Sequence, residues 1–203
     1  MDKPEEIVPA QRKGGRSSTR YSIKLRDPES ARKKYARARE NFIDVNRWHD
    51  IAGPLSAAFQ LTDNMGKIIS GPVQTGNYFR IEMPAVPGNP EGRGYDWVKV
   101  EAIEEENGEN HQWTAIRVRP AKPPINDSAP ATAHFFTNEA SSSFCIERSG
   151  TRVTASVFGR NEKPNTSPPG FFSRIRNMFI AVAAILGMSK TQWKSLVKGI
   201  IEK

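Results

Sequence analysis

The most constraining feature of this chain is a change in its hydrophobic period, from three or four residues to two, near residue 57. From there to residue 159, short alternating runs are separated by turn signals, of which Asn107-Gly108 is the strongest. Alternation is typical of half-buried strands, and Asn-Gly indicates a hairpin. No helical pattern that could form a parallel crossover lies between the runs. The pattern predicts an antiparallel meander of about six or seven strands.

Helical patterns flank the predicted strands. Asp27-Pro28 can begin a helix as N-cap and first-turn residue, and apolar residues recur at helical spacing as far as Gly53-Pro54. A second helical region covers residues 171–203, where Gly187 is expected to break the helix and Ser189–Gln192 to begin it again as a capping box. The helices must cover one apolar face of the sheet. We therefore expect an α+β fold, and a START-like helix-grip shape with an internal cavity if the sheet curls around the C-terminal helix.

The expected organisation is a flexible tail followed by one domain. Residues 1–26 contain paired Gly and Ser residues, scattered basic residues and few large apolar groups, so they are expected to remain a flexible basic arm. Residues 27–203 are expected to form a single α+β domain, with helices over 27–53, the sheet over 57–159 and helices over 171–203. Residues 161–170 are expected to be a linker.

Cysteine and hydrophobic content limit the class of protein. Cys145 is the only cysteine, so an intramolecular disulfide and a cysteine-based zinc site are excluded. The N-terminus has no secretory h-region, and the longest apolar run has 11 residues, which is too short for a transmembrane helix. We expect a cytoplasmic protein. No motif indicates a metal or a cofactor, and nothing indicates the oligomeric state.

The charge is unevenly distributed. The net charge of +8 divides into +4 over residues 1–26, +2 over 27–40, −4 over 41–159 and +6 over 160–203. The basic ends could bind a polyanion such as nucleic acid, or they could form an ordinary solvated surface that docks against the acidic middle. The polyanion hypothesis rests on the following residues: Arg12, Lys13, Arg16, Arg20, Arg32, Lys33 and Lys34.

A ligand site is predicted from aromatic and basic residues on strands next to loops rich in Pro and Gly. Arg93 lies in such a loop, and the strand residues are Tyr95, Trp97, Trp113, Arg117 and His134. Arg117 and Arg119 alternate with apolar residues, so they share one sheet face and could bind an anion. They could equally pair with Glu101 and Glu105 on the neighbouring strand. His134 could line a pocket or pack as an edge histidine.

The catalytic candidates are fewer. His49 could act as a general base oriented by Asp44 or Asp50, or it could be a half-buried histidine at a helix end. Cys145 lies between Phe144 and Ile146, which is typical of a small buried residue and not of an activated thiolate.

Several stretches distributed over residues 41–201 resemble an uncharacterised family of bacterial proteins. These stretches are NFIDVNRWHDIAG, FQLTD, GYDWVKVEAIEEE, IRVRP, AHFF, GRNEKPN and QWKSLVKG. The resemblance implies no activity. The residues therefore favour a noncatalytic binding module for a small apolar or anionic ligand or a protein partner. The alternatives are polyanion binding through the basic arm and a hydrolase-type enzyme that uses His49 with a nearby carboxylate.

Overall fold

The computed structural model describes residues 4–54, 56–83, 89, 92–124, 132–165 and 178–203, and for residues 178–189 only the course of the backbone. In chain order, its elements are the 3-10 helix η1 (Pro4–Ile7), β1 (Gly15–Lys24), α1 (Pro28–Ile43), the 3-10 helix η2 (Val45–Arg47), α2 (Trp48–Ala52), β2 (Ala58–Thr62), β3 (Tyr78–Glu82), β4 (Asp96–Asn107), β5 (His111–Pro120), β6 (Ser141–Ser149), β7 (Arg152–Glu162) and α4 (Met178–Glu202).

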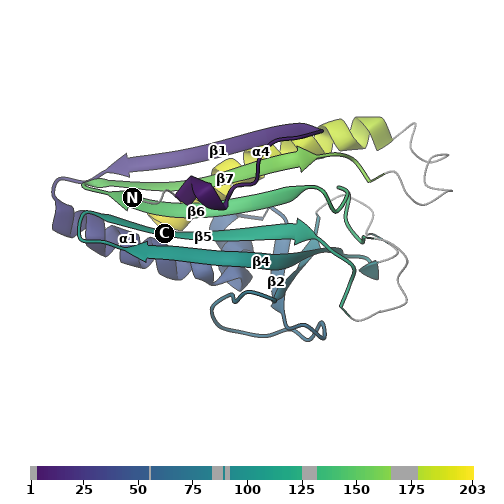
Figure 1. Cartoon of the computed structure of the whole chain (residues 1–203), viewed down its shortest axis with the longest axis horizontal. Coiled ribbons are helices and arrows are strands. Elements are labelled where there is room, and N and C mark those ends of the chain that lie inside the picture. The colour runs from purple at the N-terminus through teal and green to yellow at the C-terminus, as the bar shows by residue number, and fades with distance from the viewer. Residues whose placement is uncertain (1–3, 55, 84–88, 90–91, 125–131, 166–177) are drawn as a thin grey trace.

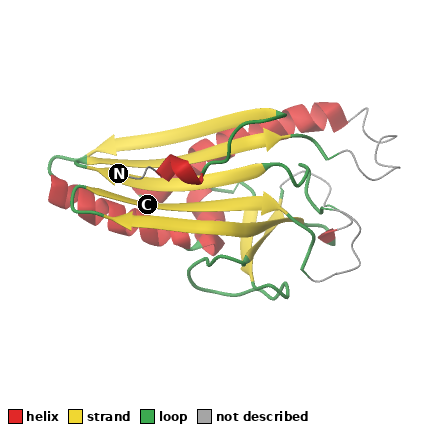
Figure 2. Cartoon of the chain, in the orientation of Figure 1, coloured by secondary structure: helices red, strands yellow, loops and turns green. Residues whose placement is uncertain are grey.

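The strands form one antiparallel sheet in the order β1-β7-β6-β5-β4-β3-β2 (Figures 1 and 2). The helices α1, α2 and α4 cover one face, which we call the inner face, and η1 lies on the other, the outer face. The predicted α+β class is therefore confirmed, and the long C-terminal helix against an antiparallel sheet gives the helix-grip arrangement.

The expectation of a flexible arm over residues 1–26 is wrong for its longest part. Residues 15–24 form β1, which pairs with β7 along nearly its whole length. The pattern Tyr21-Ser22-Ile23 explains this, because Tyr21 and Ile23 point inward and pack against the core while Ser22 points outward. A strand at the edge of a sheet tolerates Arg20 and Lys24 on either side of this pattern, since their side chains remain in solvent.

The core on the inner face is built around Trp48, which has no exposed surface. The centroid of its indole ring lies 4.8 Å from the ring centroid of Phe144 and 5.4 Å from that of Phe59. Its Nε1 donates to the carbonyl oxygen of Phe42 at 3.1 Å. The predicted helix start is also confirmed, because Asp27 accepts a hydrogen bond from the backbone N–H of Ser30.

The C-terminal helix differs from the prediction at Gly187. The backbone of α4 continues through this glycine from Met178 to Glu202, so the expected break and second helix start are wrong. A glycine in a helix interior costs only about 1 kcal/mol, which packing against a sheet easily offsets. Close packing of α4 against α2 requires glycine at position 199, because a Cβ atom there would lie 2.5 Å from the carbonyl oxygen of Ile51. Residues 171–177 lie outside the described residues.

The strand predictions were accurate for the long runs. The hairpin at Asn107-Gly108 joins β4 to β5, and Gly108 donates to the carbonyl oxygen of His111. Residues 133–137, which lie inside the stretch predicted to be strands, form only one isolated bridge, between Phe136 and Pro164. The expected linker begins later than predicted, since β7 extends to Glu162.

Among the described residues, no helix has the length and apolar character needed to cross a bilayer.

Candidate functional site

The first candidate site lies where several connections meet at one end of the sheet. We call it the loop end, formed by residues 92–97, 120–124, 132–140 and 161–165. Backbone hydrogen bonds hold these segments together: Trp97 donates to Ala133, Ala121 donates to Trp97, and Thr137 donates to Lys163. Strand ends that carry irregular connections are common places for ligand sites, because a rigid sheet positions the loops.

Trp97 is the anchor of the loop end and is only 1% exposed. Its indole Nε1 donates to the carbonyl oxygen of Gly92 at 3.0 Å, and a Cβ atom at Gly92 would lie 3.0 Å from the indole ring. The aromatic ring therefore holds the preceding loop against the sheet and is itself covered by that loop. It can shape a neighbouring site but offers little surface of its own.

Asp96 is the most unusual group at this end. Burial raises the pKa of its carboxyl group to about 7, although the side chain of Asn89 and the backbone N–H of Phe135 both donate to it. Within the described parts of the chain, no Lys or Arg forms an ion pair with it. The group is thus a half-buried acid with a pKa near neutral pH. Such groups are enriched at functional sites.

His134 lies in the segment that donates to Asp96. Its ring stacks on Phe135, with 4.3 Å between the ring centroids, and its Nδ1 accepts from the backbone N–H of Phe136 at 3.0 Å. Burial lowers the pKa of this imidazole to about 3, so it is neutral at physiological pH. With Nδ1 acting as the acceptor, the proton of the neutral ring is on Nε2.

Two further predicted residues belong to the same end. Tyr95 is half-buried, and the guanidinium of Arg80 lies 4.3 Å from the centre of its ring. Arg80 also donates from Nε to Gln60 at 2.8 Å. Arg93 occupies the turn before Tyr95 with a φ of 54°. The structure therefore brings together Arg93, Tyr95, Trp97 and His134 of the predicted ligand set.

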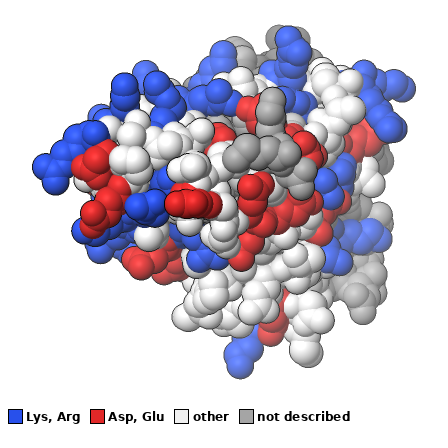
Figure 3. All heavy atoms as spheres, turned by 60° about the vertical axis from the view of Figure 1, so that its left-hand side comes forward, with Lys and Arg blue, Asp and Glu red and all other residues white. Residues whose placement is uncertain are grey.

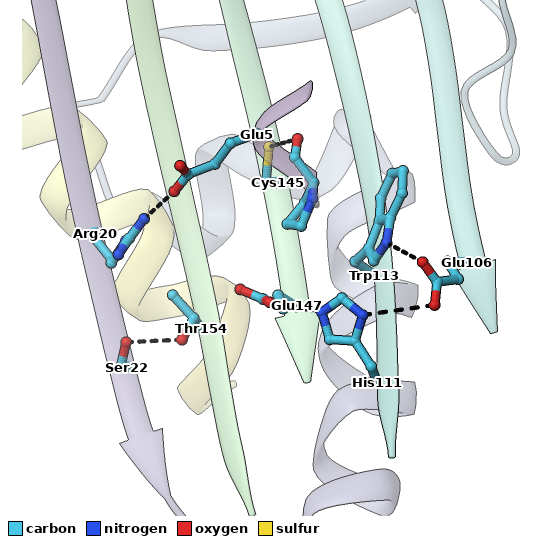
Figure 4. Close-up of polar contacts among 10 residues, drawn as sticks. Glu5, Arg20, Ser22, Glu106, His111, Trp113, Cys145, Glu147 and Thr154 are labelled. Atoms are coloured by element: carbon cyan, nitrogen blue, oxygen red, sulfur yellow. Dashed lines mark hydrogen bonds and ion pairs between the residues drawn. The ribbon is translucent and has the colours of Figure 1, made fainter. Parts of the chain in front are cut away.

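Trp113 and Arg117, the other two predicted ligand residues, lie farther along the outer face. Trp113 belongs to a small apolar cluster with Ala115, Cys145 and Phe158, and Ile7 of η1 covers it. The indole Nε1 of Trp113 donates to Glu106 at 3.0 Å (Figure 4). This tryptophan is therefore packed beneath the N-terminal segment, 4% exposed, and does not line an open site.

Arg117 forms the ion pair that the sequence suggested as an alternative. Its Nε lies 3.0 Å from Glu101, and Arg119 lies 2.6 Å from the same carboxylate, which holds the pKa of Glu101 below its usual value despite partial burial. Arg117 also donates from Nη1 to the carbonyl oxygen of Ile7 at 3.1 Å. Glu105 pairs instead with Arg39 of α1. Arg117 thus fixes the N-terminal segment.

A histidine between two carboxylates lies near the hairpin end of the outer face (Figure 4). His111 places Nε2 at 2.8 Å from Glu147 and Nδ1 at 3.7 Å from Glu106. The ring of His111 is buried, although the residue directly follows the hairpin turn. Cys145, on the next strand, is buried as expected, and burial raises the pKa of its thiol to about 12, which excludes a thiolate at neutral pH.

The predicted polyanion set is divided by the sheet. Arg12, Lys13, Arg16 and Arg20 lie on or beside β1, whereas Arg32, Lys33 and Lys34 lie on α1, which covers the inner face.

The remaining catalytic candidate, His49, has its Nδ1 3.3 Å from the hydroxyl of Ser56 and forms no ion pair with a carboxylate in the described part of the chain. No group of three His, Cys, Asp or Glu side chains among the described residues could hold a metal ion.

Sequence reasoning missed Asp96 and the N-terminal contacts of Asn161. Nothing in Tyr95-Asp96-Trp97 shows that this carboxylate will accept a hydrogen bond from Phe135, about 40 positions later in the chain. Asn161, with a φ of 54°, accepts from the backbone N–H groups of Arg12 and Lys13. A left-handed asparagine is a turn signal, but its partners are distant in sequence.

Comparisons with known proteins support the fold alone. No protein-family model matches the sequence, and no curated protein is significantly similar to it. A hypothetical protein of Helicobacter pylori is 12% identical, with a TM-score of 0.50 over 98% of this chain and 94% of that protein. The protein Ara h 8.0201 is 11% identical (TM-score 0.41, 93% of this chain and 100% of that one).

Norcoclaurine synthase from Thalictrum flavum is 10% identical (TM-score 0.39, 96% of this chain and 99% of that one). The TM-scores of Ara h 8.0201 and norcoclaurine synthase are too low to support an argument about function. The protein from Helicobacter pylori shares the arrangement of sheet and helices described above. Because that protein is itself hypothetical, the comparison agrees with the resemblance to an uncharacterised bacterial family.

Proposed function

We propose that this chain is a noncatalytic binding module that takes a small molecule at the loop end. The observation that carries the proposal is the half-buried carboxyl group of Asp96, which has hydrogen-bond donors but no ion-pairing cation among the described residues. An enclosed carboxylate without a cation is costly. A ligand that supplies a hydrogen-bond donor or a positive group next to it would remove part of that cost.

The surroundings of Asp96 suit a ligand with an apolar body. Phe135 stacks on His134, Phe136 lies beside both rings, and the imidazole is neutral, so this segment offers mostly apolar groups to a ligand. Arg93, exposed in the preceding turn, would meet an anionic group of such a ligand. Binding sites commonly combine apolar walls with a few polar groups that fix the orientation of the ligand. A protein partner that inserts a side chain at the same place would use the same chemistry.

The test is native mass spectrometry of the gently purified protein, compared with two variants. Asp96→Asn removes the buried charge with little change of shape, and Asp50→Asn makes the same change on the exposed side of α2. We expect a discrete extra mass on the wild-type chain and on Asp50→Asn, and its loss from Asp96→Asn. An extra mass that remains on a folded Asp96→Asn variant would place the ligand elsewhere, and a bare wild-type chain would contradict a tightly held ligand.

A further inference from the structure

We propose that the outer side of the β1–β7 edge binds the phosphate backbone of a nucleic-acid duplex without sequence preference. This surface lies apart from the loop-end site, so the inference does not depend on the proposed small-molecule function. We call it the edge stripe and define it by the following residues: Arg12, Lys13, Arg16, Arg20, Lys24, Arg152 and Arg160.

Strand alternation places these side chains on one surface. Arg20 and Lys24 are four residues apart in the regularly paired part of β1, so both point to the same face of the sheet. That face is the outer one, because Arg20 pairs with Glu5 of η1 (Figure 4). Arg16 lies at the bulge between Gly15 and Ser17, at the start of the strand, and is exposed there. Lys24 is opposite Arg152 on β7, which therefore points the same way. Arg12 and Lys13 continue the row beyond the other end of β1 and are exposed.

Most of the charge on the edge stripe is not neutralised by the protein. Arg16, Lys24 and Arg152 are exposed and form no ion pair with a carboxylate of the described residues. Arg160 donates to the carbonyl oxygens of Ser17 and Gly159 and forms no ion pair among the described residues, although its charge interacts with that of Glu162.

Carboxylates also lie nearby. Glu5 pairs with Arg20, and Glu162 accepts from the hydroxyl of Ser17. The seven cationic side chains outnumber Glu5, Glu6 and Glu162, so the surface carries an excess of positive charge. In Figure 3, Lys and Arg side chains stand along the upper margin, the side on which β1 lies in Figure 1, with acidic side chains gathered below them.

The composition of the surface favours nucleic acid over a lipid membrane. Proteins that bind membrane interfaces insert apolar side chains, and the only large exposed apolar residues of the described chain are Met65 and Ile68, which lie between β2 and β3 at the opposite edge of the sheet. Five of the seven basic residues are arginines, whose guanidinium groups suit phosphate oxygens. Unpaired backbone N–H groups on the free side of β1 can also donate to phosphate.

The dimensions suit a duplex. Eight residues of strand separate Arg16 from Lys24, which corresponds to about 26 Å and hence to about eight base pairs. The inner-facing Tyr21 packs against the core, so no aromatic ring of β1 is offered for base stacking. Recognition through phosphates alone gives binding that depends on salt but not on sequence.

The experiment compares two triple variants that remove the same charges. Arg16→Gln, Lys24→Gln and Arg152→Gln together neutralise the edge stripe, and Arg32→Gln, Lys33→Gln and Arg37→Gln neutralise exposed residues of α1 on the inner side. Each triple removes two arginines and one lysine. The probe is a fluorescently labelled DNA duplex of about 20 base pairs, whose affinity is measured by anisotropy between about 50 and 200 mM salt.

We expect the wild-type protein to bind the duplex with an affinity that falls steeply with salt. The edge-stripe triple should lose at least about tenfold in affinity, and its salt slope should fall by about 2 to 3. The α1 triple should stay within about twofold of the wild type, since its charges face away from the duplex. Equal losses in both triples would show that net charge alone is responsible and would overturn the proposal, as would a wild-type protein that does not bind at the lowest salt.

Two further measurements decide between related explanations. Glu5→Gln removes the carboxylate that competes for Arg20, so it should strengthen duplex binding severalfold; a weaker complex would contradict the placement of the duplex over Arg20.

Vesicles of phosphatidylserine should bind more weakly than the duplex at equal salt. Tight binding to vesicles without binding to the duplex would assign the edge stripe to a membrane surface and overturn the nucleic-acid proposal.

Discussion

The two faces of the sheet are stabilised in different ways. The inner face has a continuous aromatic core in which Trp48 contacts rings from α1, β2, β3 and β6, and three helices enclose it. The outer face has one small apolar cluster, covered by a single turn of 3-10 helix through Ile7. Around that cluster the outer face is polar and charged. The inner face therefore provides most of the folding stability, and the outer face is free to carry binding chemistry.

The largest loss of stability is expected from a substitution in the core of the inner face. Trp48→Ala removes a side chain with no exposed surface and should lower the free energy of unfolding by about 3–5 kcal/mol. Urea unfolding, followed by circular dichroism, measures the loss. Met65→Ala, at a side chain that is 75% exposed, is the control and should change stability little. A loss below about 1 kcal/mol for Trp48→Ala would show that the core repacks around the cavity.

A smaller effect is expected on the outer face. Ile7 is 1% exposed but is held by a short segment near the chain end, so Ile7→Ala should cost about 2–3 kcal/mol, toward the lower end of the range for buried aliphatic residues. The indole of Trp113 beneath it should become more accessible to iodide quenching. Val8→Ala, at a half-buried neighbour, is the matched control. Equal costs for Ile7→Ala and Trp48→Ala would remove the distinction between the two faces.

The pH dependence of stability tests the loop end. The folded state keeps a proton on Asp96 up to a pKa of about 7, whereas the unfolded carboxyl loses it near 3.8, so this group makes stability fall as pH rises between those values. His134 is neutral in the folded state down to a pKa of about 3, whereas the unfolded imidazole gains a proton below 6.5. It makes stability rise with pH over that window, and between about 4 and 6.5 the two effects nearly cancel.

Asp96→Asn should reveal the contribution of His134. Stability of this variant should rise by up to about 1.4 kcal/mol per pH unit between about 4 and 6.5, whereas the wild-type protein and Asp50→Asn should show a flatter profile. Urea unfolding at a series of pH values measures the slopes. If Asp96→Asn follows the wild-type profile, the carboxyl group of Asp96 is not protonated in the folded protein at these pH values.

Local sequence patterns were enough to predict most of the elements. Alternation located β2 to β7, and the hairpin at Asn107-Gly108 followed from turn chemistry alone. The pattern failed where a contact distant in sequence decides the outcome. Residues 15–24 look polar in isolation and become a strand because β7 offers a free edge, and α4 continues through Gly187. Edge pairing and packing against a sheet are not encoded in a short window.

The candidate sites show the same limit. Arg93, Tyr95, Trp97 and His134 were predicted and lie at one end of the sheet, whereas Trp113 and Arg117, which have the same residue types and alternation, pack beneath the N-terminal segment and beside Glu101. Residue type and alternation identify the sheet face of a side chain. They do not identify what covers it.

The sequence by itself determined the α+β class, the antiparallel strands and the residues that face the core, because hydrophobic period, turn chemistry and capping act over a few residues. Only the tertiary structure decided which strands become neighbours and which groups are enclosed. It placed β1 beside β7 and so arranged the basic residues of two distant segments in one stripe. It also buried Asp96 among residues about 40 positions away, and burial, unlike charge, exists only after the chain has folded.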